Sequence, residues 1–437
     1  MSYPDIFLTR GKRIAIMVSL IVAFFVISPT LILHTAGYSI DLQNKRIIRS
    51  GVLSIDALPN DAEVYLNNKQ IKKSLPLWLP NSLPNAYNIR IQKAGFHSWE
   101  KDIILESQKT YYIRDVELYK QSEPELLYKL DADEGSVDFS PEGKAAIIVA
   151  FDGGSADATI KLLDLKSQNL KKLFEDTIDS HFLEIQWNET GTRASISFES
   201  HGQTKLALID VESMSARSYS FSQIHTLKFQ GNTLYLQEGQ RIIEILKEAT
   251  FFARLADDTT SWYIDSSGVL WQTNGISITN AKNQFNSKTE IGTFLSVENS
   301  DVYTKENGSI KHFILSDNIA KLNYSYGFEY FVKDPVLSGY LTLSSLEANA
   351  ISPSNGLTLL SRFSRKYNNI FRQNTTGDYI VSNQNEIVAF NAGYGVTTQL
   401  LSADISGIAH SPASKKLYFW GSKAPEFPLV GIYSLSY

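Results

Sequence analysis

Two segments of this chain carry the same pattern of a turn and a strand, and that repetition limits the fold more than any other feature. FSPEGKAAIIVAF (139–151) and WNETGTRASISFES (187–200) align residue for residue at the turn. A second strand pattern follows each of them and ends in LLDL (162–165) or LIDV (208–211). The copies lie 48 residues apart at the first pattern and 46 at the second. A period of this length is typical of four-stranded propeller blades.

Weaker copies continue toward the C-terminal end. Ser-Pro turns recur at Ser140, Ser352 and Ser411, and the first and last lie 271 residues apart, or six steps of roughly 45 residues. This spacing predicts about seven blades within residues 123–437, and the imperfect copies also allow six or eight. An array of β-sandwiches would not explain why the turn and the LLDL pattern return together. We therefore predict an all-β chain ending in a β-propeller, a fold that leaves only short sheet edges.

The turn SPEGK (140–144) resembles the Ser-Pro-Asp-Gly-Lys turn that opens an inner strand in β-propellers of the TolB and WD40 type. The later copies keep only fragments of it. Asp164 and Asp210 occupy equivalent positions in the first two copies. Two carboxylates could serve as acid and base, but their repetition favours a role in the blade turns. Aspartate side chains there accept hydrogen bonds from the local backbone.

An apolar segment near the N-terminus predicts a membrane helix. IAIMVSLIVAFFVISPTLIL (14–33) contains twenty residues without a charge, enough to span the roughly 30 Å of a bilayer core. Arg10, Lys12 and Arg13 precede it and favour a cytoplasmic N-terminal tail. A cleaved signal peptide would have a shorter apolar stretch, and a buried core helix is not expected beside a basic tail.

These features predict a cytoplasmic tail at residues 1–13 and an uncleaved transmembrane signal anchor at residues 14–34. The rest of the chain would then be extracytoplasmic.

The strand and turn patterns of residues 35–122 predict a small β domain. GVLSIDAL (51–58) alternates between apolar and polar positions over most of its length, as a strand with one buried face does. Asn67 and Asn68 suit a tight hairpin turn, because asparagine tolerates positive φ.

The order of motifs in this domain resembles the PEGA family. The matching positions are Pro59 with Ala62, the hairpin at 64–69, Leu75-Pro76, the strand at 87–91 and the turn Gly95-Phe96. The sequence departs from the family pattern at Asn68, where glycine is usual, and at Leu75, where threonine is usual. The resemblance covers roughly residues 50–120. It implies a β-sandwich-like module usually found at cell surfaces, with no enzymatic activity attached to it.

Trp78 and Trp99 are candidate ligand contacts in this domain. An exposed tryptophan presents a flat amphipathic ring on which a sugar can stack. In the alternative interpretation both rings fill the core of the small domain or its edge.

The sequence contains no linear catalytic or cofactor motif. The chain has 41 basic and 46 acidic residues, and the basic ones are not concentrated in any run. Nucleic acid is therefore not an expected partner. The lack of cysteine excludes disulfides, thiolate metal sites and a cysteine nucleophile. The seven histidines are scattered, and the GxSxG, P-loop and GxGxxG patterns do not occur. We expect no cofactor and no metal.

These observations together predict a single-pass cell-envelope protein. Its propeller would recognise or scaffold a surface protein or polysaccharide without catalysis. The alternative is a propeller-based hydrolase or lyase acting on an envelope polymer, because such sites combine residues from separate blades. Carboxylates or histidines clustered around the central channel would favour the enzyme. A mixed-polar loop face would favour binding.

Overall fold

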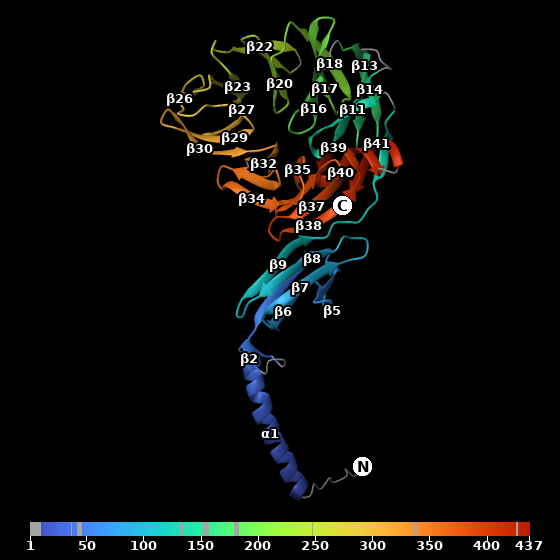
Figure 1. Ribbon diagram of the computed structural model, residues 1–437, viewed down its shortest axis with the longest axis vertical. Helices are drawn as coiled ribbons and strands as arrows, with labels where there is room; N and C mark the ends of the chain where they lie inside the picture. Colours follow the sequence, from blue (N-terminus) through green and yellow to red (C-terminus); the bar gives the residue numbers. More distant parts are fainter. Residues whose placement is uncertain are drawn as a thin grey trace, which may run out of the picture. The chain divides into compact units, whose positions relative to one another are not determined.

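The computed structural model describes residues 10–35, 37–41, 46–131, 134–151, 157–178, 183–246, 248–334, 336, 339–424 and 427–437. The chain divides into two compact units, Met1–Lys120 and Gln121–Tyr437 (Figure 1). Most of the expected cytoplasmic tail, residues 1–9, lies outside the described residues.

Helix α1 (Arg10–Thr35) contains the apolar segment. The most apolar 18 consecutive residues of its stretch Arg10–Leu33 have a mean hydropathy of 2.6, and none of that part is buried against the protein. Large side chains such as Leu20 and Phe25 are exposed by 66% and 70%. A helix whose large apolar side chains are exposed on all sides is suited to a lipid environment. This indicates a membrane anchor or a signal sequence.

The rest of the first unit is a two-sheet sandwich preceded by the hairpin of β1 (Tyr38–Asp41) and β2 (Arg46–Arg49). One sheet has the order β6-β3-β9 and the other the order β5-β4-β7-β8. The bounds are β3 (Gly51–Leu58), β4 (Glu63–Leu66), β5 (Lys69–Ile71), β6 (Leu77–Ser82), β7 (Asn85–Gln92), β8 (Trp99–Leu105) and β9 (Thr110–Glu117).

The predicted pattern of the first sandwich strand is confirmed. Leu53 and Ile55 of β3 are fully buried and pack in the core with residues such as Val64 and Ile89. Asn67 and Asn68 adopt φ values of 47° and 64° in the turn between β4 and β5, as the hairpin prediction requires.

The second unit consists of successive sets of four strands, which we call blades. The first seven blades contain consecutive strands: β11 (Glu134–Phe139), β12 (Ala145–Phe151), β13 (Asp157–Asp164), β14 (Leu170–Thr177); β15 (Leu183–Trp187), β16 (Arg193–Ser200), β17 (Gln203–Asp210), β18 (Ser215–Phe221); β19 (Thr226–Gln230), β20 (Thr233–Glu238), β21 (Arg241–Ile245), β22 (Ala249–Arg254); β23 (Ser261–Ile264), β24 (Leu270–Thr273), β25 (Ser277–Thr279), β26 (Gln284–Asn286); β27 (Thr293–Glu298), β28 (Asp301–Glu306), β29 (Ser309–Ser316), β30 (Ile319–Gly327); β31 (Tyr330–Asp334), β32 (Gly339–Ser344), β33 (Glu347–Ser352), β34 (Gly356–Arg362); β35 (Asn369–Arg372), β36 (Asp378–Ser382), β37 (Glu386–Asn391), β38 (Val396–Ser402).

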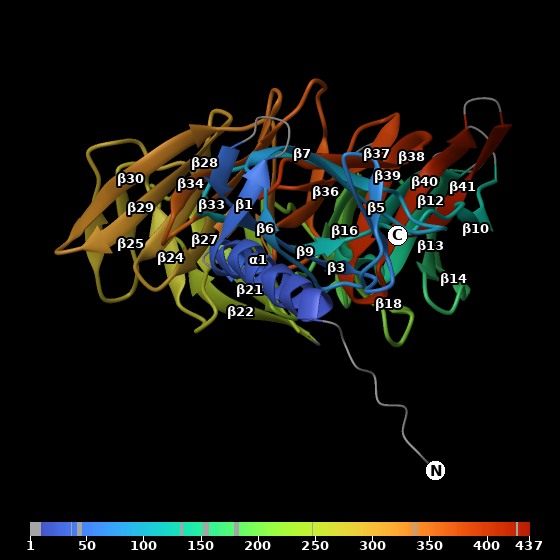
Figure 2. The same cartoon turned by 90° about the horizontal axis from the view of Figure 1, so that it is seen from below.

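The eighth blade joins the two ends of the unit. It contains β39 (Asp404–Ser411), β40 (Lys416–Ala424), β41 (Phe427–Ser436) and β10 (Glu125–Lys129). Strand β10 precedes all the other strands of the unit, yet it pairs with β41, near its end. This pairing closes the blades into a ring, and the second unit is a β-propeller. The blades follow the ring from teal through yellow to red in Figure 1 and are seen from the side in Figure 2.

The propeller core consists of apolar layers between neighbouring blades. Ile147 and Val149 of β12 pack with Ile196 and Phe198 of β16 between the first two blades. A further layer, which includes Ile148 and Ile432, joins the first blade to the eighth. The ring is therefore closed by buried side chains as well as by the strand pairing.

The described strands form eight blades, the fourth and fifth of which share one sheet through the pairing of β26 with β30. This is one blade more than the seven that the 45-residue step favoured. The count is within the range that the imperfect copies allowed. The middle blades are short: their first strands begin at Ser261, Thr293 and Tyr330. Ser140 and Ser411 do occupy equivalent turns between the first and second strands of their blades. Ser352 instead ends the third strand of its blade, so its inclusion in the repeat was wrong.

The turns at the two equivalent Ser-Pro sites contain short 3-10 helices, η1 (Pro141–Gly143) and η2 (Pro412–Ser414). Gly143 adopts a φ of +60°, and a Cβ at this position would lie only 2.6 Å from a ring carbon of Tyr418. Glycine thus permits the close packing of the first blade on the eighth.

Candidate functional site

Charged side chains from three blades of the ring meet in one cluster. The Lys333 Nζ of β31 lies 2.9 Å from the Glu189 Oε1, in the turn between β15 and β16. The same Nζ lies 3.6 Å from the Glu298 Oε1 at the end of β27. Since β15 and β31 belong to opposite blades of the eight, the contact with Glu189 joins opposite sides of the ring. We call Glu189, Glu298 and Lys333 the channel-mouth cluster.

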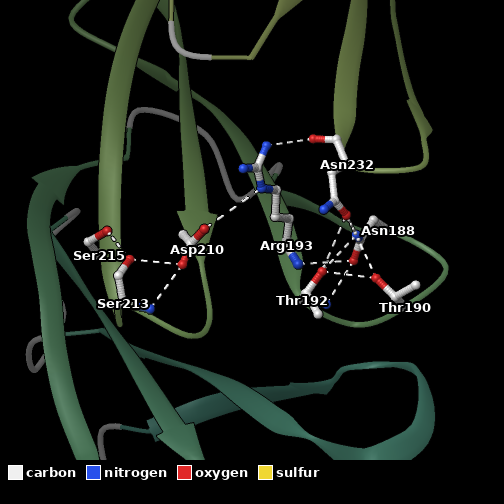
Figure 3. A network of polar contacts seen from close by, with 8 residues as sticks. All are labelled: Asn188, Thr190, Thr192, Arg193, Asp210, Ser213, Ser215 and Asn232. Carbon is white, nitrogen blue, oxygen red and sulfur yellow. Dashed lines mark hydrogen bonds and ion pairs between the residues drawn. The ribbon is translucent and has the colours of Figure 1, made fainter.

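The turn that carries Glu189 is fixed by the buried side chain of Asn188 (Figure 3). The Asn188 Oδ1 accepts hydrogen bonds of 2.9 Å from the backbone N–H groups of Thr192 and Arg193. The Asn188 Nδ2 donates to the Thr190 Oγ1 and to the Asn232 Oδ1 in the equivalent turn of the next blade. These contacts leave the turn little freedom and hold Glu189 at the channel mouth.

The two equivalent aspartates have the turn role predicted for them. The Asp210 Oδ1 accepts hydrogen bonds from the Ser213 N–H at 2.9 Å and from its Oγ–H at 2.8 Å. The Ser213 backbone bond is the main cause that lowers the pKa of Asp210 below its usual value. The Asp164 Oδ1 accepts from the N–H groups of Lys166 and Ser167. Both carboxylates are engaged in hydrogen bonds within their own turns.

Lys228 of β19 links the inner strands of three blades. Its Nζ donates to the Trp262 carbonyl of β23 at 2.7 Å and to the Phe294 carbonyl of β27 at 3.2 Å. The first strand of each blade has a free inner edge, so these carbonyls take a partner other than a strand. Burial among the blades lowers the pKa of Lys228 to about 8.

Tyr263 of β23 lies close enough to the carboxylates of Glu189 and Glu298 for their charges to affect its pKa. Burial raises its pKa to about 12, and the carboxylates of Glu189, Glu298 and Asp265 act in the same direction. Its phenol therefore stays protonated at neutral pH, and its Oη lies 3.4 Å from the side-chain amide of Gln230.

A histidine and an aspartate meet elsewhere in the propeller. The His312 Nε2 of β29 lies 2.7 Å from the Asp301 Oδ1, and its Nδ1 lies 3.1 Å from the Asn323 Nδ2. The rings of Tyr303 and Tyr324 pack against the fully buried imidazole, with centroid distances of 4.7 and 4.9 Å. Burial lowers the pKa of His312, although Asp301 opposes this shift. Both ring nitrogens have partners and the imidazole is fully buried against two aromatic rings, so this pair is part of the core.

The two candidate tryptophans have different environments. Trp99 of β8 is only 6% exposed, and a ring in the core offers no face to a sugar. Its assignment as a ligand contact is therefore corrected to a packing role. Trp78 of β6 is 51% exposed. The register pairs Ser54 with Trp78 on one side and with Tyr112 on the other, which places these two aromatics on the same face of the sheet.

The channel-mouth cluster and Lys228 were not identified from the sequence. Each of these residues belongs to a different blade, and each is a glutamate or a lysine, which are common on protein surfaces. No local sequence motif therefore distinguishes them. Among the described residues, no group of three or more histidine, aspartate or glutamate side chains could hold a metal ion. The channel end combines carboxylates, ammonium groups and a phenol. Such a mixed-polar surface favours binding over acid–base chemistry.

Comparison with known proteins identifies the sandwich. Residues 50–121 match the PEGA domain family model. No curated protein is similar enough to be matched.

Several solved structures resemble the chain at low identity. One is a chain of the mitotic checkpoint complex, 11% identical over 73% of this chain and 93% of that one, with a TM-score of 0.41. Another is the β-propeller domain of the trilobed protease from Pyrococcus furiosus, 12% identical over 80% and 98%, with a TM-score of 0.33. A third is the dihydro-heme d1 dehydrogenase NirN, 12% identical over 75% of each chain, with a TM-score of 0.43.

Because these TM-scores are low, the propeller assignment rests on the strand order of the chain itself. A PEGA domain and a β-propeller in one chain fit a non-catalytic extracellular role in general.

Proposed function

We propose that this chain is a single-pass, membrane-anchored cell-envelope protein whose extracytoplasmic propeller recognises a surface protein or polysaccharide without catalysis. Helix α1 would anchor it, and the PEGA domain would connect the anchor to the propeller. The channel-mouth cluster would form part of the recognition surface.

One observation carries the recognition role: Lys333 lies between Glu189 and Glu298 at the channel mouth. Its ammonium is paired with carboxylates from two other blades, and all three side chains are between 40% and 66% exposed. Exposed paired charges of both signs can exchange their partners for the polar groups of a ligand at little cost. A protein surface or a polysaccharide offers such groups.

Recognition can be tested by binding of purified envelope polysaccharide to the detergent-solubilised chain. Replacing all three cluster residues with alanine should lower the affinity for polysaccharide by roughly tenfold if they contact it, as loss of two or three polar contacts implies. Lys366→Ala with Glu329→Ala is the matched control, because that exposed pair lies 3.1 Å apart elsewhere on the propeller. Unchanged binding in the cluster variant would move the recognition surface away from the channel mouth.

Orientation is tested by protease treatment of intact cells that carry an epitope tag after Tyr437. We expect the tag to disappear without lysis. Protection that persists after any outer layer has been removed would contradict an extracytoplasmic propeller.

The lowered pKa of Lys228 favours the alternative function, a hydrolase or lyase acting on an envelope polymer. A lysine with a pKa of about 8 can supply an unprotonated amine near neutral pH. If the chain cleaves purified envelope polymers and Lys228→Met abolishes the cleavage without loss of folding, the enzyme interpretation replaces recognition. Cleavage that Lys228→Met leaves unchanged would exclude this lysine from the reaction.

A further inference from the structure

A polar pocket lies at the start of the folded part of the first unit. It has a volume of about 600 Å³, and its wall includes Gly37, Tyr38, Arg49, Asn81 and Lys109. This volume is within the range of small-molecule sites. Nothing in the proposed recognition by the propeller uses it.

The pocket wall is held together by contacts between the β1–β2 hairpin and the sandwich. The Gly37 carbonyl accepts hydrogen bonds from the Ser50 N–H at 2.8 Å and from the Ser50 Oγ–H at 2.7 Å. The Ser107 Oγ–H donates to the Arg49 carbonyl at 2.9 Å. The backbone around the pocket is thus fixed on both sides.

The guanidinium of Arg49 is held in place at this wall. Its Nε donates to the Tyr38 Oη at 3.0 Å, and its Nη1 donates to the Gln108 Oε1 at 2.7 Å. Its centre lies 5.4 Å from the centroid of the Tyr38 ring. A guanidinium has five N–H donors, so two hydrogen bonds leave donors for an anion. An oriented guanidinium matches the oxygens of a phosphate.

A second cation lines the same pocket. The Lys109 Nζ lies 2.6 Å from the Glu106 Oε2, and both side chains are more than half exposed. An exposed ion pair of this kind contributes little to stability, so the ammonium can turn to an anionic ligand at low cost.

The position of the pocket in the chain identifies the source of such an anion. Gly37 follows the last residue of α1, Thr35, by two positions. The hairpin beside it exposes Arg46 and also Ile47, the latter by 57%. An aromatic ring and basic side chains that reach the interface near the end of a spanning helix suit the boundary between bilayer and water on either side of the membrane.

We propose that this pocket binds the phosphate of an anionic phospholipid headgroup in the leaflet where α1 ends. Arg49 is the main contact and Lys109 the second. The inference rests on the membrane anchoring stated under the proposed function. Lipid binding here would fix the PEGA domain against the bilayer surface.

The test uses the full chain in nanodiscs of phosphatidylcholine with one-fifth phosphatidylglycerol. After extraction into mild detergent, native mass spectrometry counts the phosphatidylglycerol molecules that each protein retains. The variant Arg49→Gln with Lys109→Gln should retain phosphatidylglycerol about tenfold less tightly, because each basic residue near an anionic surface contributes several-fold in affinity. Lys69→Gln with Lys72→Gln removes the same charge from the same unit outside the pocket and should behave like wild type.

A second variant distinguishes loss of the site from misfolding, because it changes the residue conservatively. Arg49→Lys keeps the positive charge but loses the planar guanidinium, and it should show an intermediate loss of phosphatidylglycerol. Equal retention by wild type and the double glutamine variant would overturn the proposal. Retention of phosphatidylglycerol by wild type at no more than its one-fifth share of the nanodisc lipid would overturn it as well.

Two further measurements distinguish lipid phosphate from soluble phosphate as the ligand, and failure of the lipid site from failure of the membrane anchoring. Titration of the lipid-free chain with inorganic phosphate would reveal a site for soluble phosphate. Arg49-dependent phosphate binding without phosphatidylglycerol retention would contradict the lipid assignment. Failure of wild type to float with vesicles would overturn the membrane anchoring and the lipid site together. Flotation with unchanged lipid retention in the double variant would overturn the lipid site alone.

Discussion

The buried amide of Asn188 connects two blades and the turn that carries Glu189. Its oxygen accepts two backbone hydrogen bonds, and its nitrogen reaches Asn232 of the next blade at 2.8 Å. The sequence placed Asn188 in a repeated turn. It gave no indication that the side chain bridges two blades, because Asn232 lies in a weaker copy of the repeat.

Asn188→Ala should lower the free energy of unfolding by roughly 2 kcal/mol or more, because it leaves buried N–H groups unpaired. Chemical unfolding followed by tryptophan fluorescence measures this change. Asn283→Ala, at an exposed loop position, is the matched control and should stay within about 0.5 kcal/mol of wild type. Equal losses in the two variants would show that the bridge to Asn232 adds nothing.

His410 of β39 makes stability depend on pH. It is 5% exposed, its Nε2 lies 2.6 Å from the Tyr437 Oη, and burial lowers its pKa to about 4 from 6.5. Between these two values the unfolded chain binds a proton that the folded chain does not. The contribution of this group to the free energy of unfolding therefore falls as the pH falls from 6.5 toward 4.

In His410→Gln, the decrease in the free energy of unfolding between pH 7 and pH 4.5 should be smaller than in wild type by about 2 kcal/mol. Unfolding curves at the two pH values for both chains provide the comparison. The same substitution at the exposed His225 controls for the loss of an imidazole. An unchanged pH dependence in His410→Gln would mean that this group does not titrate differently in the folded and unfolded chains.

At the scale of elements, strand β10 depends on a glycine in its partner. Gly431 of β41 pairs with Lys129 of β10. A Cβ on Gly431 would lie 2.5 Å from a side-chain carbon of Leu126 and 2.8 Å from the Tyr128 carbonyl. The close approach lets the first strand of the unit pair with the last one and close the ring.

Gly431→Ala should weaken this closure and lower the free energy of unfolding by about 1 to 3 kcal/mol, the usual cost of overpacking. It should also speed proteolysis at residues 121–124, which lead into β10. Gly135→Ala is the matched control, because the nearest atom to its Cβ would lie 3.9 Å away. Closure by β10 would be in doubt if the two alanine variants unfolded and were cleaved alike.

The elements themselves were largely predictable. The strands after the turns at Ser140 and Asn188 form β12 and β16, because their alternating and apolar patterns repeat in a fixed order. The blade count was harder to predict, because the middle blades are shorter than the first two. The error at Ser352 has a different cause. A Ser-Pro pair suits a turn at several places in a blade, so its presence does not show which turn it forms.

At the scale of the whole molecule, helix α1 has exposed apolar side chains throughout its length. Such a surface is costly in water and favourable in lipid. This helix and the propeller belong to different compact units, so anchoring can be perturbed without changing the blades.

Val22→Arg with Phe24→Arg should release the chain from membranes, because each arginine at the centre of a spanning helix costs about 2.5 to 3.5 kcal/mol. Alkaline extraction of membranes separates integrated from released protein. Val22→Leu with Phe24→Leu should remain in the pellet. An arginine variant that also stays there would contradict anchoring by this helix.

The sequence by itself determined which segments are helix, sandwich and propeller. It could do so because hydrophobic periodicity and turn residues act over short distances along the chain. It also showed that Asp164 and Asp210 belong to turns. Only the tertiary structure decided that Trp99 is buried and that Lys333 meets Glu189 from the opposite side of the ring. Such contacts depend on how the blades close into a ring, which brings together residues that have no relationship in sequence.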